Sequence, residues 1–407
     1  MKQENLNILT INGGSSSIKF AMYGMAENPN KIISGQIKRI GLHNPAFTVT
    51  KNIGNKKNQI KIDAKDFKEA AEFLIEWLKK QKYFNEIVCI GHRIVHGMEH
   101  THPEIIDDNL LKELNKITEY DPNHLPAEIA IIELFKKRFP ALLQVACFDT
   151  SFHTTMPRVA KILPIPRRFD KAGIRRYGFH GLSCTYLMEA LRNIEGVEKS
   201  VGRIILAHLG SGASLTAVKE GKSMDTTMGF TPAGGLVMST RPGDLDPGVA
   251  WYIMQSKGMT ADQFNHLINH EAGLLGVSEI SSDMQDLLKK ESSDVRALEA
   301  VDLFCYQVKK WMGAFAAVLN GLDSLVFSGG IGENAPAIRS RICKGFDYLN
   351  IEIDEKENNK NAMIISTAKS KVKVYVIPTD EEIIIAKSAK ELFINSKNKK
   401  IIINEKN

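Results

Sequence analysis

The sequence predicts an α/β fold of two domains that share one duplicated architecture. Residues 7–22 read as an apolar strand, a Gly/Ser loop around Asn12 and a second strand, and residues 203–222 repeat this order around residues 208–214. Glycines let backbone N–H groups approach a ligand closely, because no Cβ is in the way, and this geometry suits phosphate. The repeat therefore predicts two phosphate-binding loops, one per domain, that face one cleft.

The length and composition fit this organisation. With 407 residues, 43% of them hydrophobic, the chain is long enough for two domains with large cores. We expect an N-terminal domain at residues 1–150 and a C-terminal domain at residues 151–382, with a final helix at 383–407 that packs back onto the first domain. The net charge of +6 is small, and no basic block is interleaved with aromatics, so nucleic acid is not a predicted partner.

Cysteine usage and the N-terminal residues predict the compartment. The five cysteines are widely spaced and include no CxxC pair, which favours reduced thiols over a disulfide framework. The N-terminal residues MKQENLNILTI lack the apolar core of a signal peptide, and no apolar run approaches the ~18 residues of a spanning helix. We expect a soluble, cytoplasmic protein with no membrane partner.

Polar residues follow several of the apolar strands. Arg93 and Asp149 lie at or just after the ends of two such strands in the first half, and Glu381 follows one in the second half. An open α/β sheet binds its ligands at the carboxyl ends of its strands. The predicted elements are helices at 66–80, 127–138, 298–319 and from 383 to about 393, strands at 86–94, 142–148, 324–327 and 372–378, a loop at 225–248, a glycine-rich turn at 328–334 and a frayed tail at 395–407.

Three alternative interpretations of these motifs are weaker. Residues 330–335 match the GxGxxA fingerprint of dinucleotide-binding proteins, with Asp347 as the acidic residue, but the match is loose, so a nucleotide without nicotinamide is favoured. Asp149, Ser151 and His153 are too close along one strand for a hydrolase triad. Four histidines have no acidic partner at HExxH spacing, so they read as core and loop residues rather than metal ligands: His92, His96, His100 and His102.

Two arginines in glycine-bearing contexts, Arg93 and Arg241, predict recognition of an anion. A planar guanidinium beside a phosphate loop suits bidentate binding of a carboxylate or phosphate. Asn12, Asp149 and Glu381 each follow an apolar strand, and together they offer oxygen ligands for Mg²⁺. Singly each of the three is more often a turn residue, but together with the two phosphate loops they indicate a Mg²⁺ site.

The ordered motifs resemble those of the acetate kinases, in the acetate/propionate kinase branch of the actin-like, sugar-kinase and chaperone-ATPase superfamily. The resemblance covers nearly the whole chain. It is carried by INGGSSSIKF (11–20), GHRIVHG (91–97), DTSFHTTMP (149–157), RRYGFHG (175–181), HLGSGAS (208–214), DTTMGFTPAGGLVMSTRPGD (225–244), FSGGIGEN (327–334) and IPTDEE (377–382).

This resemblance implies a fold of two duplicated actin-like (ribonuclease-H-like) α/β domains around a central cleft, and a homodimer that forms through the C-terminal domain. It implies direct in-line phosphoryl transfer between ATP and acetate, giving ADP and acetyl phosphate, with Mg²⁺ as the cofactor and Mn²⁺ as the alternative ion. In that case Asn12 and Glu381 hold the metal, and Lys19 lies near the nucleotide phosphates.

The remaining site residues are assigned by the same resemblance. Arg93, Asp149, His180 and Arg241 are the catalytic residues, with Asp149 at the acid/base or orienting step. The carboxylate pocket consists of Arg93, Val95, His124, Phe179 and Pro232. ATP is surrounded by His208, Leu209, Gly210, Ser211, Gly212, Asp283, Met284, Gln285, Gly330, Ile331, Gly332, Glu333 and Asn334.

Several positions depart from the family pattern. Gln285 replaces an arginine near the nucleotide, and Asn123 is polar at a position of the acyl pocket that is usually apolar. These departures leave the nucleotide preference and the choice between acetate and propionate open. The alternatives are therefore a propionate or other short-chain acyl kinase and, from a different class, an actin-like or chaperone-like nucleotide-driven binding module. The other departures are Met98, Cys184, Ser211 and Asp380.

Overall fold

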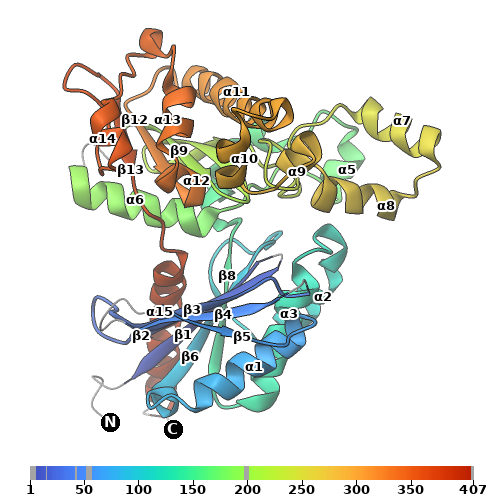
Figure 1. Ribbon diagram of the computed structural model, residues 1–407. Coiled ribbons are helices and arrows are strands. Elements are labelled where there is room, and N and C mark those ends of the chain that lie inside the picture. Colours follow the sequence, from blue (N-terminus) through green and yellow to red (C-terminus); the bar gives the residue numbers. More distant parts are fainter. Residues whose placement is uncertain (1–5, 15, 42–43, 52–56, 197–200, 405–407) are drawn as a thin grey trace. The chain divides into compact units, whose positions relative to one another are not determined.

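The computed structural model describes residues 6–14, 16–41, 44–51, 57–196 and 201–404 (Figure 1). The chain forms two compact units. Unit 1 consists of Met1–Ser151 and Asp380–Asn407, and unit 2 consists of Phe152–Thr379. Within the described residues, no helix has the length and apolar character needed to cross a membrane.

Unit 1 is built on a mixed eight-stranded sheet in the order β5-β4-β3-β2-β1-β6-β8-β7. The strands β1 to β5 form an antiparallel meander, while β6 is parallel to both β1 and β8. The carboxyl ends of β1, β6 and β8 therefore meet at one edge of the sheet. The strands are β1 Asn7–Gly14, β2 Ser17–Gly24, β3 Lys31–Lys38, β4 Ala46–Lys51, β5 Lys57–Lys61, β6 Ile87–Ile94, β7 Glu104–Ile105 and β8 Leu143–Phe148.

Helices pack against the unit 1 sheet through apolar residues. Helix α1 (Phe67–Lys79) begins at the predicted cap, because the Asp66 side chain accepts a hydrogen bond from the Glu69 backbone N–H. It joins α3 (Leu125–Arg138) over one apolar cluster, and α2 (Asp108–Lys116) packs with α3 in a second. Helix α15 (Glu381–Asn404) runs along β1, β6 and β8, where a Cβ on Gly91 would overlap Ile385 (Figure 1).

Unit 2 repeats the central topology of unit 1. Its five-stranded sheet has the order β11-β10-β9-β12-β13, with β9 antiparallel to β10 and parallel to β12. The order β3-β2-β1-β6-β8 in unit 1 thus corresponds to β11-β10-β9-β12-β13 in unit 2, strand direction included. This correspondence confirms the predicted duplication of an α/β architecture. The strands are β9 Arg203–Leu209, β10 Ala213–Lys219, β11 Lys222–Thr226, β12 Ser324–Ser328 and β13 Lys373–Val376.

Two long helices pack on the unit 2 sheet. Helix α6 (Gly181–Glu195) buries Cys184, Leu187 and Leu191 against β9 and β12, and α11 (Val295–Val318) packs against β9, β10 and β11. The remaining helices are α4 Arg158–Lys161, α5 Arg167–Lys171, α7 Pro247–Lys257, α8 Ala261–His266, α9 Gly273–Ser278, α10 Met284–Lys290, α12 Gly329–Asn334, α13 Pro336–Cys343 and α14 Glu355–Asn359.

The structure corrects three expectations near the end of the chain. Residues 329–334, predicted as a glycine-rich turn, form the short helix α12. Helix α15 continues to Asn404, so the frayed tail predicted at 395–407 is wrong as far as that residue, and residues 405–407 lie outside the described part. Residues 380–382, which we expected in the C-terminal domain, group with unit 1, where Tyr23 donates a hydrogen bond to Asp380.

Candidate active site

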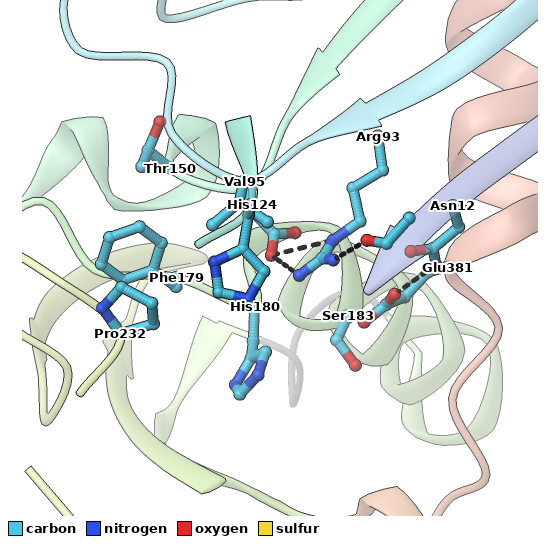
Figure 2. A network of polar contacts seen from close by, with 12 residues as sticks. Asn12, Arg93, Val95, His124, Thr150, Phe179, His180, Ser183, Pro232 and Glu381 are labelled. Carbon is cyan, nitrogen blue, oxygen red and sulfur yellow. Dashed lines mark hydrogen bonds and ion pairs between the residues drawn. The ribbon is translucent and has the colours of Figure 1, made fainter. Parts of the chain in front are cut away.

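Arg93, Asp149 and Gly13 form the centre of a polar cluster at the carboxyl edge of the unit 1 sheet. Arg93 is the last residue but one of β6, Asp149 directly follows β8 and Gly13 lies at the end of β1. Arg93 donates from Nε and Nη2 to Asp149 Oδ2 at 3.1 and 2.5 Å, and from Nη1 to the Gly13 carbonyl at 2.8 Å (Figure 2). The guanidinium is thereby fixed by two neighbouring strands.

The Arg93–Asp149 pair is shielded from water. The Asp149 side chain is fully buried and that of Arg93 is 13% exposed. Burial by itself lowers the pKa of the Arg93 guanidinium, but Asp149 and then Glu381 outweigh it, so the pKa lies above its usual value. Arg93 is therefore a permanent positive charge in this cluster.

Asn12 and Glu381 add an amide and a carboxylate to the same edge. The Asn12 amide donates to Glu381 Oε2 at 2.9 Å (Figure 2). It also donates to Glu382 Oε1 at 3.3 Å, so the end of β1 is joined to the first turn of α15. Lys19 pairs with Asn12 in the β1–β2 ladder. Burial raises the pKa of Glu382, and the positive charge of Lys19 limits this rise. We call Asn12, Gly13, Arg93, Asp149 and Glu381 the Arg93 cluster.

Val95 and His124, both predicted to line the carboxylate pocket, also belong to unit 1. Val95 follows β6, is buried, and donates its backbone N–H to Glu128 Oε2 at 3.1 Å. His124 is the residue before α3, and its Nδ1 lies 2.8 Å from Asp121 Oδ1. The Asp121 carboxylate favours the tautomer in which Nδ1 carries the proton and Nε2 is an acceptor.

His180 is the centre of a second cluster, in unit 2. It adopts a left-handed conformation (φ 59°) just before α6, and its Nδ1 lies 2.9 Å from Ser214 Oγ in β10. Its ring centroid is 4.3 Å from that of His208, and His208 Nδ1 lies 2.9 Å from Ser183 Oγ. A strained backbone of this kind persists only where neighbouring contacts hold it, and it is enriched at functional sites.

The predicted residues Gly212 and Arg241 lie next to His180. A Cβ built on Gly212 would be 3.0 Å from Arg241 Nη2 and 3.2 Å from His180 Nε2. Arg241 also donates from Nη1 to the Pro232 carbonyl at 2.8 Å. Phe179, the residue before His180, is buried. We call His180, His208, Gly212, Ser214 and Arg241 the His180 cluster.

The glycine segments assigned to the nucleotide lie close to this cluster. A Cβ on Gly210 would be 3.6 Å from the Gly330 nitrogen, so the β9–β10 loop and the start of α12 are adjacent. Glu333 Oε1 accepts from the Gly329 N–H at 2.8 Å and from the Thr379 N–H at 3.2 Å. Asp283 caps α10 through the Gln285 N–H, and among the described residues no hydrogen bond links that turn to the two glycine segments.

Comparison with known proteins identifies the family. A model of the "Acetokinase family" matches residues 7–387. The acetate kinase of Methylocella silvestris is 41% identical over 393 residues, covering 93% of this chain and 96% of that protein. The acetate kinase of Clostridium kluyveri is 41% identical over 398 residues, covering 95% and 98%. The chain belongs to the acetokinase family.

Solved structures of family members share the fold. The acetate kinase of Porphyromonas gingivalis, 36% identical, aligns with a TM-score of 0.84 over 95% of this chain and 100% of its own. A propionate kinase of Francisella tularensis, 35% identical, aligns with a TM-score of 0.88 over 95% and 99%. The predicted family and the duplicated actin-like fold class are therefore confirmed.

Two histidines of the weaker interpretations, His92 and His153, are buried and hydrogen-bonded. His153 lies in unit 2, hydrogen-bonded to Ser223 Oγ and the Phe179 carbonyl, and burial lowers its pKa to about 4. His92 is buried against Gln144 at 2.7 Å, and burial lowers its pKa to about 4. Within the described part of the chain, no group of three or more His, Cys, Asp or Glu side chains has the arrangement of a metal site.

Three polar residues near the clusters were missed from the sequence. Ser183 contacts both His208 and Thr379, and its spacing from His180, one turn along a helix, was an available signal. Ser214 ends the glycine loop and contacts His180. Glu128 is buried on the apolar side of α3. The signal in the sequence was its spacing, because a residue four positions before the apolar Ile132 lies on the same side of a helix.

Proposed function

We propose that this protein is an acetate kinase that transfers the γ-phosphoryl group of ATP directly to the carboxylate of acetate, giving ADP and acetyl phosphate, in a reversible reaction. The observation that carries the proposal is the buried guanidinium of Arg93, fixed by Asp149 and the Gly13 carbonyl, in a chain of the acetokinase family. Arginine at the carboxyl edge of a sheet suits a small carboxylate.

The chemistry demands cations and positioning rather than a covalent nucleophile. The acceptor carboxylate and the γ-phosphate repel one another, and negative charge spreads over the phosphoryl oxygens in the transition state. Arg93 orients the acceptor, and Arg241 and His180 donate hydrogen bonds to the transferring group. Acetate is already ionised at neutral pH, so Asp149 need not remove a proton; it orients Arg93 through two hydrogen bonds to one oxygen.

The nucleotide and metal are assigned by the same reasoning. The β9–β10 loop and α12 supply the backbone N–H groups that surround the ATP phosphates, with Asp283, Met284 and Gln285 toward the rest of the nucleotide. Asn12 and Glu381 lie within hydrogen-bond distance of one another and offer hard oxygen ligands, a donor set that fits Mg²⁺ completed by water and phosphate. Bound there, the ion neutralises phosphate charge.

The test is to trap the acyl phosphate with hydroxylamine across a series of short carboxylates. Acetate, propionate and butyrate are each supplied with ATP and Mg²⁺, and kcat/KM is measured for each acceptor. We expect the hydroxamate to form with acetate as the best acceptor. A higher kcat/KM for propionate would assign the chain to the propionate kinases, and ATP hydrolysis without any hydroxamate would overturn the proposal.

We also propose a homodimer that forms through unit 2. Helix α7 has no buried residue, and Trp251 and Tyr252 on it are 67% and 65% exposed. Two large aromatic side chains so exposed on one helix favour a covered protein surface. Sedimentation should give a dimer, and W251E with Y252E should give a monomer; a wild-type monomer at micromolar concentration would exclude this surface.

A cytoplasmic location is the last part of the proposal. All five cysteines are buried and no disulfide joins them, which fits a reducing compartment.

A further inference from the structure

Glu128 is a buried acidic residue beside the Arg93 cluster that has no assigned role. It lies in the first half of α3 and is 4% exposed. Its Oε2 accepts the Val95 N–H at 3.1 Å, whereas Oε1 is buried and receives no hydrogen bond from any described residue. A Cβ built on Gly13 would be 3.5 Å from Cγ of Glu128, so the Glu128 side chain lies against the end of β1.

The charges around Glu128 do not favour an ionised carboxylate. Arg93 is the positive group that faces it, but all of the Arg93 hydrogen bonds described above go to Asp149 and to the Gly13 carbonyl. Asp149, at the end of β8, and Asp121, before α3, face it with negative charge. The residues of α1 and α2 that pack against α3 in the core are apolar, and β1 contributes the backbone of Gly13. The ion pairs Lys136–Asp108 and Arg138–Glu76 join the exposed parts of these helices.

We propose that Glu128 stays protonated in the working enzyme and is a positioning residue for the acceptor: one oxygen fixes the Val95 backbone, and its neutrality keeps a further negative charge away from the guanidinium that binds the incoming carboxylate. This inference rests on the proposed role of Arg93 in binding that carboxylate. Ionisation of Glu128 would place a second negative charge beside a guanidinium that Asp149 already neutralises, and it would repel the acceptor anion.

The protonation equilibrium agrees with this arrangement. Burial raises the pKa of Glu128 to about 8, although Arg93 and the Val95 N–H oppose the rise. Because the folded pKa exceeds that of the unfolded chain, the folded protein retains a proton that the unfolded chain has released. The free energy of unfolding therefore falls as the pH rises from about 4.5 to about 8, and this contribution is constant above that range.

The first experiment compares the pH dependence of KM for acetate in the wild type, E128Q and E133Q. Glutamine is neutral at every pH and keeps an acceptor for the Val95 N–H, and Glu133 is an exposed residue of the same helix. If the acceptor binds only the protonated form, KM rises about tenfold between pH 7 and pH 9 in the wild type and in E133Q. In E128Q that rise is absent and kcat is retained. Equal pH profiles for the wild type and E128Q would overturn the proposal.

The second experiment does not depend on activity. Denaturant unfolding of the wild type and E128Q is followed between pH 5 and pH 9. We expect the stability of E128Q relative to the wild type to increase up to about pH 8 and then to level off. A difference that is independent of pH means that Glu128 ionises normally, and it overturns the inference even if the enzyme phosphorylates acetate. The expected pH-dependent difference in a protein that forms no acyl phosphate would instead refute the proposed function alone.

If E128Q does not fold, ¹³C-carboxyl labelling of the glutamates in the wild type provides the same information. The inference requires a glutamate carboxyl that stays protonated at pH 7 and titrates near pH 8. A spectrum in which every glutamate is ionised by pH 7 would overturn it.

Discussion

The two units contain equivalent sheets, but the arginines of their polar clusters have different hydrogen-bond acceptors. In unit 1 the strands β1, β6 and β8 present Asn12, Arg93 and Asp149, and the arginine is paired with a carboxylate that is fully buried. In unit 2 the equivalent strand β9 leads into a glycine loop beside His180 and Arg241, and Arg241 donates to the neutral Pro232 carbonyl. Duplication has thus preserved the backbone while the side chains have diverged.

This difference separates two tasks of an arginine. Pairing Arg93 with Asp149 fixes its direction but cancels much of its charge, which suits the recognition of a weak, singly charged acceptor. Arg241 lies beside His180 and the Gly212 loop, where its N–H groups suit the developing charge of a transferring phosphoryl group. The comparison predicts that the two arginines fail in different ways when they are removed.

Removal of Arg241 should have the largest effect on the reaction. We expect R241A to lower kcat by about 10²–10³, the typical cost of losing one donor to developing charge. The free energy of unfolding of R241A is measured beside kcat, so that a loss of folded protein is separated from a loss of catalysis. R296A, which removes an exposed arginine that pairs with Glu279 and Asp294, serves as the control. Rates like the wild type in R241A would remove this residue from the mechanism.

Removal of Arg93 should lower stability as well as activity. R93A leaves Asp149 as a buried charge without its arginine, and breaking a buried pair in this way costs about 3–5 kcal/mol. Chemical denaturation of R93A, D149N and the double variant measures the coupling between the two residues. If the ion pair accounts for the lost stability, D149N should restore part of the stability that R93A loses. A double variant no more stable than R93A would contradict this explanation.

The central strands of both units were predictable from sequence, whereas the partners of the side chains were not. Alternating or continuous apolar runs that end in glycine predicted β1, β2, β9, β10 and β12 because strand periodicity is local. The end of α15 was missed because Lys and Asn after Phe393 look like a solvated tail, although they are acceptable helix residues. Helix α12 was missed because glycine favours turns in isolation.

The candidate site was predictable residue by residue, mainly through the family motifs, but its geometry was not. Nothing in the motifs indicates that Asp149 uses a single oxygen for Arg93, or that the Gly13 carbonyl completes the arginine's contacts. The residues that link the motifs to one another, such as Ser183, lie between the motifs. Such contacts depend on the tertiary packing of elements distant in sequence, which no local pattern encodes.

A smaller effect is expected from a methyl group added at the glycine loop of unit 2. In G212A the new Cβ would lie 3.0–3.2 Å from Arg241 and His180, so both side chains must shift by a few tenths of an ångström. We expect kcat to fall about tenfold, in keeping with the steep cost of misplaced catalytic groups. G229A, where an added Cβ meets nothing within 4 Å, should keep its rate. Equal rates in the two variants would show that the close approach at Gly212 is irrelevant to turnover.

The last prediction concerns the thiols, which report on the integrity of each unit separately. Burial raises the pKa to about 12 for Cys89 and Cys147 in unit 1 and for Cys305 and Cys343 in unit 2. At pH 8 the native thiols should react with iodoacetamide roughly 10³-fold more slowly than in the unfolded chain, because so little thiolate is present. Labelling followed by mass spectrometry as denaturant is raised would then show which pair becomes reactive first. The hydrogen bonds that R93A removes lie within unit 1. R93A should therefore expose Cys89 and Cys147 at lower denaturant than Cys305 and Cys343. R241A should leave the order of the wild type unchanged.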